Sequence, residues 1–361
     1  MILLLITTTS ITFLLYLYHL TLRALTPLLT ESSETKLDFP TRELSGTRVT
    51  VLLLYHIARS TLRRIGIGSP LSVNHDGTQH TLDKVDSSLS MPFLITSSDI
   101  QTYIQCISAT PITHDQILSN PYHLQLLLSA LTEPSMLLLL SKVNCPIDPV
   151  GSVNVRNRFE LLDPSLCQKS LEDSIQGKKV DLVARSRLDK DVKKVKRGWE
   201  FTIIVELLFK GEAIYRQEFT SLQFHKHPVP PGVHNRSQDI AVEPIGEFSI
   251  GEKEPSTWAK LSKDYNPIHT SDIAARLLGF RKKIAHGNHV VAKAIYESSD
   301  KLRAMEVGKG KKIWMEVELK RPITIPSELE IKVSDGGSEK GKQYMEIWLN
   351  GKVATSVTCG I

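Results

Sequence analysis

The chain opens with a run that lacks charged side chains. Residues 1–22 contain no Asp, Glu, Lys or Arg, and the first charge is Arg23. About 20 apolar, Thr and Ser residues in a helix match the ~30 Å hydrocarbon layer of a bilayer. Tyr16 and Tyr18 lie near the end of the run, where an interfacial aromatic belt is expected. We interpret residues 1–30 as a transmembrane anchor that enters the membrane through residues 1–22.

Two other interpretations of this run stay open. A secretory signal peptide usually has a basic start and a small-residue cleavage site, and both are missing here. A mitochondrial presequence is poor in acids but rich in Arg, whereas Arg23 stands alone. If the helix spans, Arg23, Lys36, Arg42 and Arg48 follow it, and the positive-inside rule leaves the globular part in the cytosol. We therefore expect an endomembrane protein facing the cytosol, with a mitochondrial location as the alternative.

Residues 31–90 combine one apolar stretch with a polar segment. Val49–Ile57 is apolar but too short to span, and it leads into the basic segment Ala58–Ile65. Together they predict an amphipathic helix that lies on a membrane or, equally well, packs on the globular body. Ser69–Ser90 is polar and contains Gly, Asp and Ser, which is typical of a loop. We interpret 31–90 as a linker with an amphipathic segment.

The next part of the chain predicts a buried helix and a set of strands. Ser97–Asp99 has the composition of a helix cap. Pro121–Leu140 is strongly apolar, and Pro134 is expected to break it into halves too short to span a membrane, so we predict a buried helix inside a core wrapped by a sheet. Alternating positions predict strands, and the charged segment Asp189–Gly198 predicts a hairpin turn. The predicted strands are Val153–Phe159, Lys179–Leu188, Trp199–Phe209 and Ala213–Phe224.

The last part of the chain repeats this pattern. Prolines cluster in His225–Arg236, which predicts an inter-domain linker. After it we expect a strand, short helices from about Pro255 and from Ser271 to Leu278, and a helix over Gly287–Leu302. One helix wrapped by a long antiparallel sheet is an α+β pattern, and it occurs twice. The predicted strands are Ile245–Ile250, Lys312–Leu319, Glu328–Val333, Gln343–Leu349 and Val353–Thr358.

Composition limits the class of partner. The 361 residues suggest two domains, and 41% hydrophobic with 23% charged residues is ordinary for a globular protein. The net charge of +5 suits an anionic partner such as coenzyme A, an acidic carrier protein or a membrane surface. It is too weak and dispersed to indicate nucleic acid. The four cysteines form no CxxC pair, so we expect buried thiols in a reducing compartment rather than zinc or disulfides.

One segment carries residues suited to acid–base chemistry. Asp264 and His269 are five positions apart, with Asn266 and Pro267 between them, and Pro267 disfavours helix for Asn266. A shaped loop can turn the carboxylate and the imidazole toward one point, where they can activate a water and return a proton. Downstream, Gly287 opens an apolar helix. A backbone N–H there suits a thioester carbonyl that gains negative charge.

These residues resemble a known signature. The family of MaoC-like dehydratases, which includes the (R)-specific enoyl-CoA hydratases (hydratase 2), has the pattern Gly, Asp, any residue, Asn, Pro, aliphatic, His, followed by Gly-Phe and Ala-His-Gly. Here Asp264–His269 is followed by Gly279-Phe280 and Ala285-His286-Gly287. The resemblance covers about residues 240–361 and implies the hotdog fold, a long helix wrapped by an antiparallel sheet.

The resemblance also implies an organisation for the whole chain. Pro121–Leu124 and Pro149–Arg158 resemble a degenerate N-terminal hotdog of double-hotdog members, without the Asp-Asn-His loop. We therefore expect a degenerate hotdog at 91–225, a linker at 226–239 and a catalytic hotdog at 240–361. The two halves would share substrate binding, and the fold is compatible with a homodimer.

The implied reaction is a reversible hydration of a trans-2-enoyl thioester to an (R)-3-hydroxyacyl thioester in fatty acid metabolism, carried by coenzyme A or acyl carrier protein. Asp264 and His269 would hold and activate the water, Asn266 would fix the loop, and the Gly287 N–H would polarise the carbonyl. The thioester itself acidifies the C2 proton. No cofactor and no metal are therefore expected.

Two positions depart from the signature. Lys263 replaces the usual glycine before the aspartate, where positive φ or close approach favours glycine, and its ammonium could lower the pKa of the aspartate. Asn288 stands where a hydrophobic residue usually follows Ala-His-Gly, so a polar group enters the expected acyl tunnel. These departures support an alternative, in which the protein is a catalytically impaired thioester-binding or scaffold hotdog.

Overall fold

The structure is a computed structural model that describes residues 23–65, 73–75, 80–82, 87–224, 241–299, 311–334 and 341–361. The expected membrane segment at residues 1–22 and the expected linker at 226–239 lie outside the described residues.

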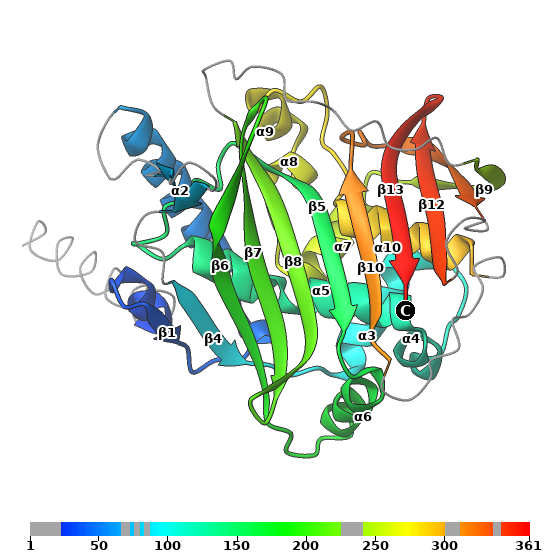
Figure 1. The fold of residues 1–361 in the computed structure, drawn as a ribbon, viewed down its shortest axis with the longest axis horizontal. Helices are drawn as coiled ribbons and strands as arrows, with labels where there is room; N and C mark the ends of the chain where they lie inside the picture. The colour runs from blue at the N-terminus through cyan, green and yellow to red at the C-terminus, as the bar shows by residue number, and fades with distance from the viewer. Residues whose placement is uncertain are drawn as a thin grey trace, which may run out of the picture.

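Two antiparallel sets of strands join into one large sheet (Figure 1). They meet where β5 pairs with β10, from Leu161 opposite Ile313 to Arg156 opposite Glu318. The first set comprises, in spatial order, β4 (Ser88–Pro92), β6 (Leu182–Val195), β7 (Gly198–Phe209), β8 (Glu212–Phe224) and β5 (Ser152–Leu161). The second comprises β10 (Ile313–Leu319), β13 (Lys352–Gly360), β12 (Lys342–Leu349), β11 (Ser327–Ser334) and β9 (Glu243–Ile250).

Each set of strands has its own central helix. The first is α5 (Pro121–Leu140) and the second is α10 (Gly287–Glu297), and both lie behind the sheet in the view of Figure 1. The two helices contact each other. The chain is therefore an α+β protein with two hotdog units joined edge to edge, which confirms the predicted fold class. Further helices surround them: α3 (Ser97–Ile107), α4 (His114–Ser119), α6 (Pro164–Ile175), α7 (Glu254–Ser262), α8 (Pro267–Thr270) and α9 (Asp272–Leu277).

The helix α5 is continuous, so the expected break at Pro134 was wrong. Among the described residues it is the one helix long and apolar enough to cross a membrane, but 89% of its apolar window is buried inside the protein. Packing on all sides holds the helix together, since it outweighs the single hydrogen bond that a proline removes. The interpretation as a buried core helix is confirmed.

Several boundaries differ from the sequence-based prediction. The charged segment at Asp189–Gly198 is not a long turn, because β6 continues through a bulge to Val195 and pairs with β7. In this last part of β6, most of the charged side chains are exposed to water while the backbone continues to pair with β7. The helix α10 ends at Glu297, before Leu302. The helix α6 was not predicted, although Asp163 caps it by accepting from Leu166 N and Pro164 begins it.

Residues 31–90, interpreted as a linker with an amphipathic segment, contain ordered elements. The strand β1 (Glu34–Lys36) pairs in parallel with β4 and extends the first sheet. The helix α2 (Gly46–Arg64) follows, with Ser45 as its N-cap. The 3-10 helix η3 (Thr41–Glu43) and the strands β2 (Val73–His75) and β3 (His80–Leu82) also belong to this region, and the 3-10 helix η2 (Arg23–Leu29) precedes it.

Candidate active site

The loop that carries the motif lies between α7 and α8. Its shape comes from two hydrogen bonds in which a side chain accepts from the backbone N–H two residues further along the chain. Asp264 Oδ1 accepts from Asn266 N at 3.1 Å, and Asn266 Oδ1 accepts from Ile268 N at 3.3 Å, so Asn266 caps α8. Pro267 occupies the first helical position, where its missing N–H costs nothing. Asn266 therefore shapes the loop, as the sequence suggested.

His269 and Asp264 face each other across a short gap. His269 Nδ1 lies 2.8 Å from the carbonyl oxygen of Ile284, which can only accept, so Nδ1 carries the proton. The Nε2 lone pair then lies 3.8 Å from Asp264 Oδ2. Burial lowers the pKa of His269, and this lowering is opposed by the Asp264 carboxylate and the Ile284 carbonyl. A neutral imidazole with its free nitrogen beside a carboxylate can accept a proton from a water held between them.

His286 is a third member of this group that sequence reasoning left without a role. Its ring stacks on the ring of His269 with centroids 3.8 Å apart. Its Nε2 donates to the carbonyl oxygen of Asp264 at 3.1 Å and lies 3.6 Å from Asp264 Oδ2. Burial, with His269 next, holds the pKa of His286 well below its usual value. His286 therefore supports the orientation of Asp264, and its place in the Ala-His-Gly segment was the signal for it.

Gly287 begins α10 beside this group. Its N–H is the first of the helix and has no carbonyl partner within the helix, and the N-cap His286 makes no side-chain capping hydrogen bond. A Cβ at this position would lie 2.7 Å from Leu319 Cδ1. Glycine lets the Leu319 side chain of β10 pack directly against the helix start, and the backbone N–H stays open for a ligand oxygen.

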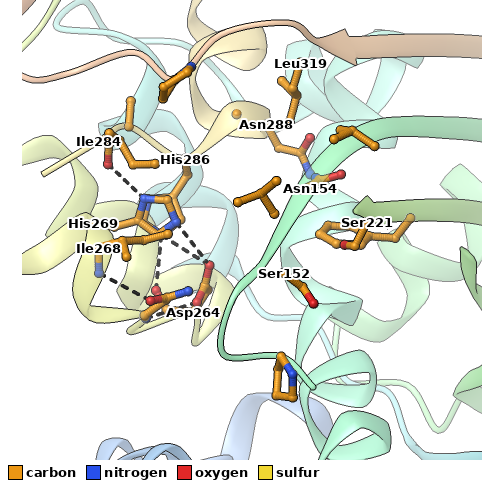
Figure 2. A pocket seen from close by; sticks show the side chains of 18 of the residues that line it. Ser152, Asn154, Ser221, Asp264, Ile268, His269, Ile284, His286, Asn288 and Leu319 are labelled. Atoms are coloured by element: carbon orange, nitrogen blue, oxygen red, sulfur yellow. Dashed lines mark hydrogen bonds and ion pairs between the residues drawn. The ribbon is translucent and has the colours of Figure 1, made fainter. Parts of the chain in front are cut away.

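The group lies on the wall of a cavity of about 520 Å³ between the two hotdog units. Figure 2 shows Asp264, His269 and His286 on one side and Ser152, Asn154 and Ser221 of the first unit on the other. The volume is in the range of sites for small organic ligands. Both units thus line the cavity. The apolar wall includes Met136, Leu137 and Leu140 of α5, Phe201 and Ile203 of β7, and Phe219 and Phe224 of β8.

The first unit also places an acid in this cavity. Glu133 of α5 lines the wall, and its carboxyl group hydrogen-bonds with Ser262. Burial, then the negative charge of Asp264, raises the pKa of Glu133 well above its usual value. The neutral acid is therefore the favoured form here. Glu133 was not predicted from the sequence, although a single acid within an apolar helix was a visible signal.

The two departures from the signature have clear structural settings. Asn288 Oδ1 accepts from Asn157 Nδ2 at 2.8 Å, and Asn288 Nδ2 donates to Ser129 Oγ at 3.0 Å. Its polar side chain thus joins α10 to β5 and α5 at the cavity wall. Lys263 adopts φ 60°, the left-handed conformation at the end of α7. Its Nζ donates to Lys260 O at 2.9 Å.

Asp264, His269 and His286 together could be considered as metal ligands, because one atom of each lies within 4.8 Å of the others. The chemistry does not fit well. His286 Nε2 faces the Asp264 carbonyl oxygen at 3.1 Å and must carry a proton there. A protonated nitrogen cannot bind a metal, and the two remaining atoms are fewer than a zinc site uses. The arrangement is suited to proton transfer instead.

The fold and the loop together define a class, the hotdog proteins with an Asp–His pair facing a cavity shared by two units. Comparison with known proteins supports the assignment to this class. Residues 227–353 match the model of the MaoC like domain. The second half of the chain is therefore a MaoC-like domain, as the motif predicted.

Similar proteins extend over both halves. A 3-hydroxyacyl-thioester dehydratase X of Mycobacterium tuberculosis is 24% identical over 216 residues, which are 57% of this chain and 68% of that protein. A crystal structure of HtdX of the same organism matches 76% of this chain and 100% of its own, with TM-score 0.55 and 18% identity. The MaoC-like dehydratase of Phytophthora capsici matches 76% of this chain and 94% of its own, with TM-score 0.54 and 14% identity. The homology supports a hydratase or dehydratase, that is, a hydro-lyase.

Proposed function

We propose that this protein adds water reversibly to trans-2-enoyl thioesters and forms (R)-3-hydroxyacyl thioesters. The observation that carries the proposal is the pair formed by Asp264 Oδ2 and His269 Nε2, 3.8 Å apart on a cavity wall. The similarity to a 3-hydroxyacyl-thioester dehydratase supports the same class of substrate. The (R) product and the use of an enoyl thioester follow from the resemblance of the motif.

The geometry supports a sequence of steps for hydration. A water between the pair donates one hydrogen to Asp264 and one to His269, since both atoms accept. As the water oxygen bonds to C3, one of its protons passes to this pair and the C2=C3 electrons move toward the thioester oxygen. The Gly287 N–H stabilises the negative charge on that oxygen. The same proton then returns to C2 on the same face, so that H and OH are added and nothing else is consumed.

The cavity suits an acyl group at one end and a polar group at the other. Its first-unit wall is mainly apolar and comes from α5, β5, β7 and β8, while Asp264, His269 and Gly287 gather on the second-unit wall. We propose that the acyl chain packs on the first unit while the thioester lies at the start of α10. The carrier is coenzyme A or acyl carrier protein, and chain length is set by the apolar wall.

The test is hydration of a series of enoyl-CoA substrates by the full-length protein. We expect Asp264→Asn and His269→Ala each to lower kcat by roughly 10²–10⁴-fold, the contribution typical of a positioned acid or base. Asp115→Asn, an exposed carboxylate in the first turn of α4, is the matched control and should keep the wild-type rate. Retention of the full rate in both active-site variants would contradict the proposal. Identification of the product enantiomer by chiral chromatography tests the (R) assignment.

A further inference from the structure

The helix α2 has two unlike faces. Its buried face packs on the protein through Leu52, His56 and Ser60. The opposite face exposes Leu54 at 62% and Ile57 and Leu62 at 44% each. At about 100° per residue, these three exposed positions fall within an arc of about 140° centred opposite the buried ones. The exposed Thr50, Ala58 and Thr61 fall within the same arc, so the outer face is an uncharged stripe in which large apolar side chains alternate with threonines.

The helix is firmly held, so the stripe has a fixed direction. Arg59 donates to the carbonyl oxygens of Leu140 at 2.7 Å and of Lys142 at 2.9 Å. Arg63 donates to the carbonyl oxygen of Cys145 at 2.9 Å, and Ser60 donates to Asp148 Oδ2 at 2.7 Å. All these partners belong to residues 140–148, the end of α5 and the loop that follows. Arg59 and Arg63 thus bind the body of the protein, while Leu54, Ile57 and Leu62 remain exposed.

The start of the described chain is attached to the same loop. Val143 N donates to Leu28 O at 2.9 Å, and Lys142 Nζ donates to Ser32 O at 2.8 Å. Leu29 is 64% exposed and Val143 is 40% exposed, which adds two apolar side chains near this attachment. The uncharged run of residues 1–22 therefore leads directly into the region that carries the stripe.

We propose that this surface, defined as Leu29, Val143 and the α2 stripe of Leu54, Ile57 and Leu62, lies on a lipid bilayer. The sequence before this surface favours a bilayer over other partners, because residues 1–22 carry no charge and only the helix η2 separates them from the exposed Leu29 side of the surface. The α2 sequence contains Arg48, Arg59, Arg63 and Arg64 but no acid, so an anionic lipid surface does not repel it. An uncharged run long enough to enter a bilayer and a fixed, uncharged stripe with three large apolar side chains are two signals of the kind that together give stable attachment.

The surface also connects to the cavity. Leu140 and Pro149, at either end of the loop that α2 holds, both line it. If the proposed function is right, the apolar wall of the cavity therefore begins directly beneath the membrane-facing helix. The membrane proposal itself does not depend on the reaction, and its test uses no substrate.

The test places one fluorescent label at a time on the full-length protein. Leu54→Cys and Leu62→Cys are labelled with an environment-sensitive dye, and Lys352→Cys is the control, exposed at the start of β13 on the second unit (Figure 1). The native Cys106, Cys145, Cys167 and Cys359 are buried and should not react. Vesicles of phosphatidylcholine and phosphatidylserine are the membrane, with and without lipids that carry a quencher in their acyl chains.

We expect the emission of both α2 labels to shift to shorter wavelength on vesicles and to be quenched from within the acyl layer, while the Lys352→Cys label changes little. Labels on α2 that stay as exposed to water as the control would overturn the proposal. A blue shift that is already present without vesicles, and that lipid quenchers do not affect, would also overturn it. That result would show that another part of the chain or a second copy covers the stripe. Hydratase activity is read separately, so the failure of one proposal leaves the other intact.

Discussion

The two hotdog units share an architecture but differ at the start of the central helix. In the first unit, α5 begins with Pro121, which has no N–H, and Asn120 Oδ1 accepts from the next two donors, Tyr122 N at 3.0 Å and His123 N at 3.2 Å. In the second unit, α10 begins with Gly287 and has no side-chain cap. The first helix start is closed and the second is open to a ligand. We infer that the uncapped start of α10, next to the Asp264–His269 pair, is what distinguishes the second unit as the site.

Closing the open start of α10 is the most direct test of this difference between the two units. Gly287→Ala places a Cβ 2.7 Å from Leu319 Cδ1, so either the Leu319 side chain or the helix start must move, and we expect the helix start to be displaced. We expect the hydration rate to fall about 10²-fold, the loss typical of a displacement near 1 Å at a reacting group. The free energy of unfolding should fall by about 1–3 kcal/mol because of overpacking. The measurements are kcat with an enoyl-CoA and urea denaturation.

Two further variants separate these effects. Gly46→Ala, at a helical position with nothing within 4 Å of the added Cβ, should leave the rate unchanged and add at most about 1 kcal/mol of stability, since alanine has less freedom in the unfolded chain. Asn120→Ala removes the cap of α5 and should cost about 1 kcal/mol of stability without a change in kcat. Equal losses of activity in Asn120→Ala and Gly287→Ala would show that the two helix starts do not differ in function.

Acid should weaken the second unit more than the first. Burial lowers the pKa of His289 in α10 to about 4, and burial also lowers those of His269 and His286. On the side of the first unit, burial lowers the pKa of His123 in α5 to about 4 and that of His56, which bonds to Ser141 at the end of α5, to about 3. The unfolded chain has the higher pKa, near 6.5, so it binds protons first as the pH falls. Stability is complete above about pH 6.5 and is lost below it, by roughly 3 kcal/mol for each histidine whose pKa falls to about 4.

Hydrogen exchange at about pH 7 and about pH 5 measures this difference. We expect the amides of α10 to exchange faster at the lower pH, relative to a peptide reference, by a larger factor than those of α5. Global stability measured in urea should fall over the same interval. A protein that is equally stable at both values, or more stable in acid, contradicts the neutral state of these histidines.

The hydrogen bonds of Asn288 to Asn157 and Ser129, which join the two units, can be tested next. Asn288→Met puts a hydrophobic residue at the position, and it leaves the Asn157 amide and the Ser129 hydroxyl without their partner. We expect the free energy of unfolding, measured by urea denaturation, to fall by about 1–3 kcal/mol, the cost of unsatisfied buried polar groups. The double variant with Ser129→Ala should recover part of it, since one of the unpaired groups is then removed. A single variant as stable as the wild type would mean that the polar bridge has no net effect.

The sequence predicted much of the second unit because its signature is local. Asp264, Asn266 and His269 lie within six residues, and the loop geometry follows from Asx turns and Pro267. Glu133 and Asn157 were missed for the opposite reason. They reach the site only through packing of α5 and β5 against the second unit, and sequence periodicity carries no information on contacts more than 100 residues apart. The break predicted at Pro134 was wrong because the sequence shows a local helix breaker but not the burial of α5 on all sides, which keeps the helix continuous.

The smallest expected effect concerns Lys263, which raised the alternative of an impaired protein. Its φ of 60° is strained for a residue with a Cβ. Its Nζ donates to Lys260 O. Burial lowers the pKa of Lys263, and the charges that also act on this pKa are those of Asp99 and Arg42 rather than of Asp264. Lys263→Gly should therefore relieve strain and add less than about 1 kcal/mol of stability, because glycine also gains freedom in the unfolded chain. Lys210→Gly, at φ 51° between β7 and β8, is the matched control and should gain a similar amount. We expect kcat to be unchanged in both variants, measured beside urea denaturation. A large rise in kcat in Lys263→Gly alone would mean that this lysine impairs the catalytic loop, and that the natural protein binds thioesters better than it hydrates them.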